Sequence, residues 1–208
     1  PEGGGLLIIL VTSLLFTIIL PLLKIFGVKI THVYPINQEI NIIFFSLLSF
    51  GLLGLYDDIV KYFELQRELG YSGLKTSHKF LIQAILGLTI GSLMYFNLSL
   101  HIINVPFIGV MDLGLWFIPI SAFLVMTFSN AVNITDGMDG LAAGLLMISL
   151  FGFLILSASI LDIPLSIFIA LWLGGLIAFL YFNVYPARIF MGDTGAMAFG
   201  AALAVIGL

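Results

Sequence analysis

Long apolar runs, each about as long as a bilayer is thick, restrict what this chain can fold into. Of its 208 residues, 61% are hydrophobic and only 9% are charged, and the mean hydropathy is +1.22. Soluble domains carry about 25% charged residues, so a water-soluble fold of this size would expose too much apolar surface. The natural solvent is a lipid bilayer, which a helix crosses with roughly 20 apolar residues.

The hydropathy pattern predicts an all-α, polytopic transmembrane helix bundle with about seven spans. Each span should be a helix, because lipid offers the backbone no other hydrogen-bond partners, and strand-like alternation typical of a transmembrane barrel is absent. We expect one integral-membrane domain over residues 1–208. We expect it to be truncated at both ends, because the chain begins with Pro1 and its last apolar run stops short. The expected spans are residues 5–26, 40–56, 80–97, 113–132, 138–161, 164–184 and 195–208.

Charged residues collect on one side of this topology. Each span moves the chain across the membrane, so four segments share a side: residues 1–4, 57–79, 130–139 and 185–194. Five of the seven Lys and Arg residues lie there: Lys61, Arg67, Lys75, Lys79 and Arg188. The positive-inside rule therefore makes this side cytoplasmic. Asp112 and Asp162 fall on the opposite side, whereas the other five aspartates share the cytoplasmic side: Asp57, Asp58, Asp136, Asp139 and Asp193.

The segment "GLLGLYDDIVK" places two adjacent carboxylates, Asp57 and Asp58, at the end of the second span. Their repulsion is larger at a low-dielectric boundary, and a bound cation, a neighbouring lysine or a retained proton would relieve it. A solvated helix end with an i,i+3 ion pair to Lys61 is an equally good interpretation. Lys61 can also be a membrane anchor rather than part of a site.

The segment "NAVNITDGMDGLAAG", residues 130–144, adds two aspartates and two asparagines. Asp136 and Asp139 would share a face if they lie on a helix. The alternative is that Asp136 caps a span that starts near Gly137. A cap accounts for one aspartate but leaves the other, together with Asn130 and Asn133, unexplained, so we favour a functional site.

A third segment, "FNVYPARIFMGDTGA", joins the last two spans and contributes Asn183 and Asp193. Capping of the last helix by Asp193 or Thr194 is the alternative. Arg188 can be a phosphate clamp, but a membrane anchor is favoured. Lys79 stands at the start of the third span, on the same side as the aspartates. Most of residues 59–79 is expected to be a solvated cytoplasmic segment.

Carboxylates and amides without cysteine or paired histidines favour a hard, oxygen-seeking cation such as Mg²⁺. The chain has no cysteine, which excludes disulfides and thiolate metal sites, and no basic tract that suggests nucleic acid. Mg²⁺ usually keeps water and phosphate oxygens among its ligands. A phosphate or pyrophosphate substrate is therefore expected at the cytoplasmic edge of the membrane, where a soluble nucleotide can meet a lipid phosphate.

The segments "LYDDIVK", "SNAVNITDGMDGLAAG" and "FNVYPARIFMGDTGA" resemble the signature segments of the polyprenyl-phosphate N-acetylhexosamine-1-phosphate transferases, and more closely those of its muramoyl branch. The resemblance spans essentially the whole chain. It implies transfer of phospho-MurNAc-pentapeptide from UDP-MurNAc-pentapeptide to undecaprenyl phosphate in a bacterial cytoplasmic membrane, with Mg²⁺ as cofactor. It also implies peptidoglycan precursor synthesis. The sequence does not decide between a monomer and a homodimer.

The resemblance and the shared side together suggest roles for ten residues. Asp193 is expected to bind the metal. The expected catalytic residues are Asp57, which would deprotonate or position the lipid phosphate, with Asp58, Asp136 and Asp139. The expected substrate-binding residues are Lys61, Lys79, Asn130, Asn133 and Asn183. Two alternatives stay open: a sibling transferase that uses UDP-GlcNAc or another UDP-HexNAc, and, more distantly, a cation transporter with aspartates along its ion path.

Overall fold

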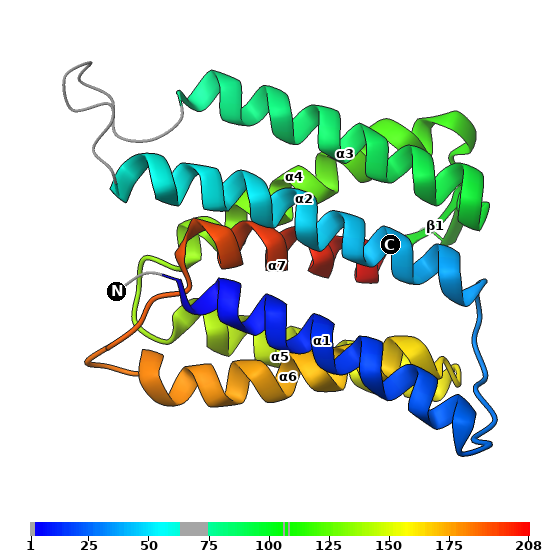
Figure 1. Cartoon of the computed structure of the whole chain (residues 1–208). Helices are drawn as coiled ribbons and strands as arrows, with labels where there is room; N and C mark the ends of the chain where they lie inside the picture. Colours follow the sequence, from blue (N-terminus) through cyan, green and yellow to red (C-terminus); the bar gives the residue numbers. More distant parts are fainter. Residues whose placement is uncertain (1–2, 63–74, 106, 108) are drawn as a thin grey trace.

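The structure, a computed structural model, is a bundle of long helices (Figure 1). It describes residues 3–62, 75–105, 107 and 109–208. The part of the expected solvated segment at residues 63–74, with Arg67, therefore lies outside the described residues. The described helices are α1 (Gly4–Ile25), α2 (Ile36–Tyr62), α3 (Thr76–Leu98), α4 (Phe117–Thr135), α5 (Leu141–Ser159), α6 (Ile163–Asn183) and α7 (Gly192–Gly207).

The all-α, polytopic fold class is confirmed. Within the described part of the chain, the six helices α1 to α6 are long and apolar enough to cross a membrane, and α7 is a shorter apolar helix of 16 residues. Many large apolar side chains on their outer faces are exposed, as expected where lipid is the solvent. The protein is an integral membrane protein, and every helix lies within a few residues of an expected span.

Helix α7 lies at the centre of the bundle, between α2, α4 and α1 (Figure 1). Its sequence, GDTGAMAFGAALAVIG, consists largely of small residues, and nearly all of it is buried. A Cβ atom on Gly54 of α2 would overlap the carbonyl of Asp193, and one on Gly200 of α7 would overlap the carbonyl of Phe128 in α4. Small residues let membrane helices approach closely, so these positions allow α7 to pack within the bundle.

The remaining helices form two pairs beside this centre, α3 with α4 and α5 with α6, while α1 packs on α6. A cluster of aromatic rings, including Phe16, Phe44, Phe168 and Trp172, joins α1, α2 and α6. Sequential helices run in opposite directions, so the C-terminal ends of α2, α4 and α6 lie at the same end as the N-terminal ends of α1, α3 and α7 (Figure 1).

A short hairpin between α3 and α4 was not predicted from the sequence. Strands β1 (Ile102–Val105) and β2 (Gly109–Asp112) pair antiparallel, with Ile102 opposite Asp112, and a one-turn 3₁₀ helix, Gly114–Trp116, leads into α4. Each strand has only four residues, too few for alternation to stand out in the sequence. The hairpin lies at the end of the bundle where α3 finishes (Figure 1).

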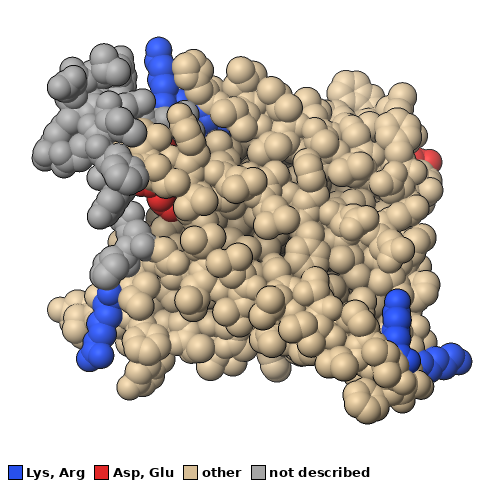
Figure 2. Space-filling model, in the orientation of Figure 1, with Lys and Arg blue, Asp and Glu red and all other residues tan. Residues whose placement is uncertain are grey.

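Charged side chains on the face drawn in Figure 2 lie toward the two ends of the molecule, and the broad middle between them carries none. This banded surface is what a protein with a lipid-facing middle should present, because charges in hydrocarbon are costly. It also means that the charged chemistry of this face is confined to two layers, one at each end of the helices.

Candidate active site

Four helix ends meet at one end of the bundle and gather polar side chains from distant parts of the sequence (Figure 1). Residues 57–61 form part of the last turns of α2, and Lys79 lies in the first turn of α3. Asn133 lies in the last turn of α4, and Asp193 lies in the first turn of α7. Helix α2 continues beyond the expected boundary, which places Asp57, Asp58 and Lys61 on regular helix.

Two lysines bridge two carboxylates at the middle of this end. Lys79 Nζ donates to Asp57 Oδ2 at 2.9 Å and to Asp193 Oδ2 at 3.0 Å. Lys61 Nζ donates to the same Asp193 oxygen at 2.8 Å and lies 3.3 Å from Asp57 Oδ2. The ion pair of Lys61 within α2 is thus formed with Asp57, four residues away, rather than with Asp58.

The four side chains differ in exposure in a way that matters for chemistry. The side chain of Asp57 is only 4% exposed, and those of Lys79 and Asp193 are 16% and 17% exposed, whereas that of Lys61 is 40% exposed. A nearly buried carboxylate needs cationic partners to offset its lost hydration. Lys61 can turn toward water or toward an arriving anion, while Lys79 is held among the carboxylates.

Asn133 fixes the other side of the Asp193 carboxylate. Its Nδ2 donates to Asp193 Oδ1 at 2.8 Å, so one oxygen of Asp193 binds the amide and the other binds the two lysines. The orientation of this carboxylate is therefore set by three helices, α2, α3 and α4, in addition to its own helix.

Asp58 faces a different partner from Asp57. Its carboxylate accepts hydrogen bonds from Asp193 N at 3.1 Å and Thr194 N at 2.9 Å, and from the Thr194 hydroxyl at 2.6 Å. These amides belong to the first turn of α7, where they have no partner within the helix. Asp58 thus caps α7 from another helix, and neither Asp193 nor Thr194 caps it with its own side chain, as the capping alternative had required.

Asp136 and Asp139 do not share a helical face, contrary to the geometry considered from the sequence. Helix α4 ends at Thr135 and α5 begins only at Leu141, so both aspartates lie in the turn between them, and Asp136 does not cap α5. Asp136 Oδ2 accepts from Gly192 N at 3.1 Å, and Asp139 Oδ2 accepts from Ala187 N at 2.9 Å. Each carboxylate holds the backbone of the α6–α7 connection.

The two remaining asparagines also bind protein groups. Asn183 accepts from Gly140 N at 3.1 Å and donates to the Ile189 carbonyl at 2.9 Å, which ties the end of α6 to the start of α5. Gly140 adopts a positive φ of 73°, a conformation that suits glycine. Asn130 pairs with Gln83 of α3, a residue that sequence reasoning missed because a single glutamine in an apolar span carries no motif.

The carboxylates of this end are the groups that could hold a Mg²⁺ ion. The described residues include no group of three or more His, Cys, Asp or Glu side chains that could hold a metal by themselves. Asp57 and Asp193, however, turn one carboxylate oxygen each toward the same two ammonium groups. Mg²⁺ commonly takes one or two carboxylates and completes its shell with water and phosphate oxygens, so this pair fits the ion when a phosphate substrate is present.

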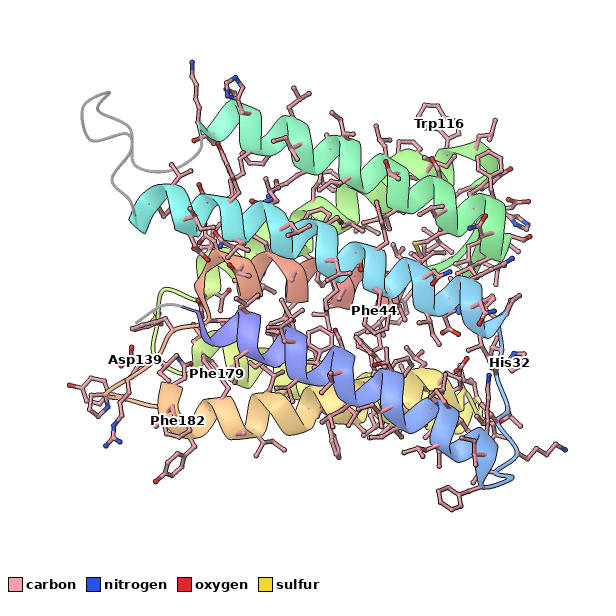
Figure 3. The ribbon with its side chains drawn as sticks, in the orientation of Figure 1. His32, Phe44, Trp116, Asp139, Phe179 and Phe182 are labelled. Carbon is pink, nitrogen blue, oxygen red and sulfur yellow. The ribbon has the colours of Figure 1, made fainter. Side chains whose placement is uncertain are left out.

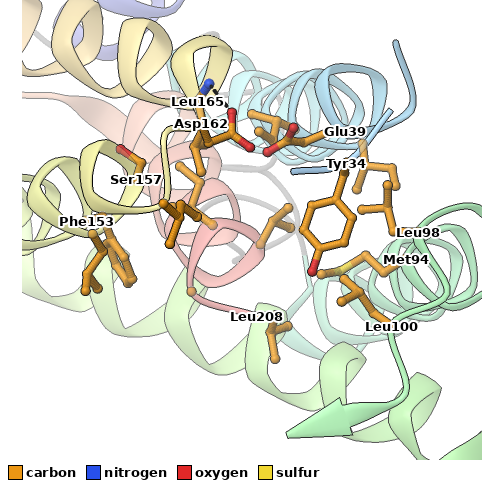
Figure 4. Close-up of a pocket in the computed structure, with 17 residues that line it drawn as sticks. Tyr34, Glu39, Met94, Leu98, Leu100, Phe153, Ser157, Asp162, Leu165 and Leu208 are labelled. Atoms are coloured by element: carbon orange, nitrogen blue, oxygen red, sulfur yellow. Dashed lines mark hydrogen bonds between the residues drawn. The ribbon is translucent and has the colours of Figure 1, made fainter. Parts of the chain in front are cut away.

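The opposite end of the bundle contains a second pair of acidic residues and a cavity of about 280 Å³. The carboxylates of Glu39 and Asp162 point toward one another at one edge of this mostly apolar cavity (Figure 4). Asp162 accepts from Leu165 N and Val33 N, so it caps α6. Figure 3 places His32 at this end and Asp139 at the other, in agreement with the predicted division of sides.

Comparison with known proteins identifies the family. The model of glycosyl transferase family 4 matches residues 40–208, which include most of α2, all of α3 to α7 and all ten residues with expected roles. The chain belongs to this family. The resemblance drawn from the three signature segments is thereby confirmed, and the segments that carry it are those that meet at the end of the bundle described above.

Curated relatives of this family member are named phospho-N-acetylmuramoyl-pentapeptide-transferase. That of Caldanaerobacter subterraneus subsp. tengcongensis is 34% identical and aligns with 100% of this chain and 60% of its own length. The relatives from Listeria monocytogenes and Clostridium perfringens are each 38% identical, over 80% and 83% of this chain and 51% and 52% of theirs. The chain thus spans between half and three fifths of the length of these relatives.

Proposed function

We propose that the protein containing this chain transfers phospho-MurNAc-pentapeptide from UDP-MurNAc-pentapeptide to undecaprenyl phosphate. The products are the lipid-linked sugar, lipid I, and UMP. The names of the relatives support this reaction, and one observation about the chain carries it: Asp57 and Asp193 are joined through Lys61 and Lys79 at the end of an apolar bundle. Two anionic reactants can meet there, one from water and one from lipid.

The reaction joins two groups that repel each other. An oxygen of the lipid phosphate attacks the phosphorus attached to the sugar, the phosphoanhydride bond to UMP breaks, and UMP leaves with the electron pair. Catalysis of such transfers is mainly positioning and charge stabilisation. Lys61, the more exposed lysine, would bind a substrate phosphate, and Lys79 would compensate charge deeper in the site.

Mg²⁺ is part of this proposal. Bound at Asp193, with Asp57 beside it, the ion would neutralise the pyrophosphate as a Lewis acid. The protein groups then have separate tasks. Asp57 would position the lipid phosphate or accept its proton, and Asn133 would keep the Asp193 carboxylate in the orientation it has here.

The other three aspartates would act through the backbone. Asp58 and Asp136 hold the first amides of α7, next to Asp193, and Asp139 holds the α6–α7 connection. We infer that they keep the site in shape rather than react. We also place this end of the bundle at the cytoplasmic face of a bacterial inner membrane, because four of the described Lys and Arg residues lie there and two lie at the other end.

The test is turnover by the full-length protein in detergent or vesicles, with undecaprenyl phosphate and either UDP-MurNAc-pentapeptide or UDP-GlcNAc. Release of UMP with the muramoyl donor only is expected. Release with UDP-GlcNAc only would replace the proposal by a sibling transferase. No UMP from either donor, together with cation flux in vesicles, would favour the transporter alternative.

A further inference from the structure

Two amide side chains form a closed pair between α3 and α4, one helical turn inside the site. Asn130 Nδ2 donates to Gln83 Oε1 at 2.8 Å, and Gln83 Nε2 donates back to Asn130 Oδ1 at 3.3 Å. Asn130 also donates to the Met126 carbonyl at 2.8 Å. Gln83 is completely buried, so its amide depends on Asn130 for hydrogen bonding.

The pair lies on a seam where the two helices touch closely. Further along α3, a Cβ atom on Gly91 would overlap the Ser121 side chain, and one on Gly87 would come within 3.0 Å of the Ala122 carbonyl. Small residues therefore set the distance between the helices at these points. A reciprocal amide pair is directional and fixes the register, because a shift breaks both hydrogen bonds.

The next residues along the seam are those that hold Asp193. Lys79 precedes Gln83 by four positions on α3, and Asn133 follows Asn130 by three positions on α4, so each lies on the same face as its neighbour. Lys79 donates to Asp193 Oδ2, and Asn133 donates to Asp193 Oδ1. The relative position of α3 and α4 thus determines whether both oxygens are held at once.

We propose that Gln83 and Asn130 are a positioning pair that sets the register of α3 against α4, and through Lys79 and Asn133 orients the Asp193 carboxylate. This inference rests on the proposed function and deepens it. It gives Asn130 a task different from the direct substrate binding expected from the sequence, and it assigns a role to Gln83, which no motif covers. Neither residue needs to touch a substrate.

The test is a double-mutant cycle in the full-length protein, with near-isosteric apolar replacements. Gln83→Met and Asn130→Leu are each expected to lower kcat roughly tenfold while KM for both substrates stays within about twofold, because a misplaced carboxylate costs transition-state stabilisation. The double variant should be no worse than the poorer single variant, since both changes remove the same pair. The exchange Gln83→Asn with Asn130→Gln should recover part of the loss.

Thr89→Ala is the matched control, because Thr89 is exposed on α3 and bonds only the Ile85 carbonyl of its own helix among the described contacts. It should leave kcat unchanged. A raised KM in Asn130→Leu, with losses that multiply in the double variant, would show that Asn130 contacts substrate directly and would overturn the proposal.

A second readout does not require turnover. The Lys79 side chain is only 16% exposed and its ammonium group is bonded to two carboxylates, so an acylating reagent should reach it more slowly than the exposed Lys75 in the wild-type protein. In Gln83→Met the Lys79 rate, measured by mass spectrometry against Lys75, should rise severalfold. An unchanged rate would reject the positioning role, whereas a raised rate in a protein without UMP release would reject only the proposed transferase function.

Discussion

The two ends of the bundle both bring carboxylates together, but they treat them differently. At one end, Asp57 and Asp193 share two lysines, and the Asp193 carboxylate also binds an amide. At the other end, Asp162 serves as a helix cap, and one oxygen of the buried Glu39 carboxylate has no hydrogen-bond partner among the described groups. Convergence of acidic residues is therefore common to both ends and does not by itself make a reaction site.

The difference between the ends lies in exposed positive charge and in the number of helices that contribute side chains. Lys61 is well exposed and can leave its carboxylate partners to bind a phosphate, while Lys79 compensates the negative charge of Asp57. Groups from four helices bond to one another there, which favours a preorganised site where the metal and phosphates would bind. The opposite end has two acidic side chains beside a mostly apolar cavity, and within the described contacts neither forms an ion pair with a lysine.

The largest effect should follow neutralisation of Asp193. Asp193→Asn keeps the shape of the side chain but removes the charge that would bind Mg²⁺, and turnover should fall at least about 1,000-fold, as when a major charge-stabilising group is lost. UMP release at several Mg²⁺ concentrations measures it. The control is Asp112→Asn, an exposed aspartate at the opposite end, which should keep full activity. Normal turnover in Asp193→Asn would remove this residue from the metal role.

The second prediction compares the two lysines. Lys79→Met leaves the nearly buried Asp57 with less compensation and should destabilise the protein by about 3 kcal/mol. Lys61→Met should cost less than about 1 kcal/mol of stability, because its ion pairs are more exposed.

The same two variants should differ in kinetics. Turnover should fall about 100-fold in Lys79→Met, and Lys61→Met should act mainly through a higher KM for the nucleotide-sugar. Thermal unfolding in detergent and initial rates measure these effects, and equal destabilisation by the two changes would contradict the assignment.

The helices, and the end of the bundle at which each polar segment lies, could be predicted from the sequence. Hydropathy locates the apolar helices, and each helix moves the chain to the other side. Apolar runs predicted the number of α-helices found in the described part of the chain, with α7 the shortest of them. The alternation of sides along the chain then placed Asp57, Asp136 and Asp193 at the same end. Lys61 and Lys79 contact Asp57 and Asp193 because the ends of α2, α3 and α7 that carry these residues lie at the same end of the bundle. The match of three signature segments then identified the family without any coordinates.

The local roles could not be read in the same way, because they depend on partners that are distant in the chain. Asp58 caps a helix that begins 134 positions later, with Gly192 as its first residue. The sequence shows only that Asp58 is adjacent to Asp57, and this suggested that the two residues share a catalytic role. Asp136 and Asp139 were interpreted by helical periodicity, but Gly137 and Gly140 belong to a turn there. Gln83 has no signal in the sequence beyond being polar in an apolar span.

A third prediction tests whether the packing beneath Asp193 matters as much as its charges. Gly54→Ala would place a methyl group against the Asp193 carbonyl, push α7 away from α2 and lower turnover roughly tenfold, with about 2 kcal/mol of destabilisation from overpacking. Gly144→Ala, on α5, would add a methyl group that meets no atom of a neighbouring helix and should be neutral or slightly stabilising. Initial rates and thermal unfolding of both variants measure these effects. If Gly54→Ala and Gly144→Ala had equal turnover and stability, the close contact of α2 with α7 would not be needed for the site.

The smallest effects are expected at the opposite end, where a loss of turnover would contradict the difference between the two ends. Asp162→Ala removes the cap of α6 and should lower stability by about 1 kcal/mol, whereas Glu39→Gln removes a buried charge and should leave stability equal or higher. Neither change should alter kcat by more than about twofold, because both residues lie at the far end of the helices from Asp57 and Asp193. If Glu39→Gln lowered turnover tenfold while the protein stayed folded, the two ends would be coupled, and the reaction could no longer be assigned to the lysine-bridged end alone.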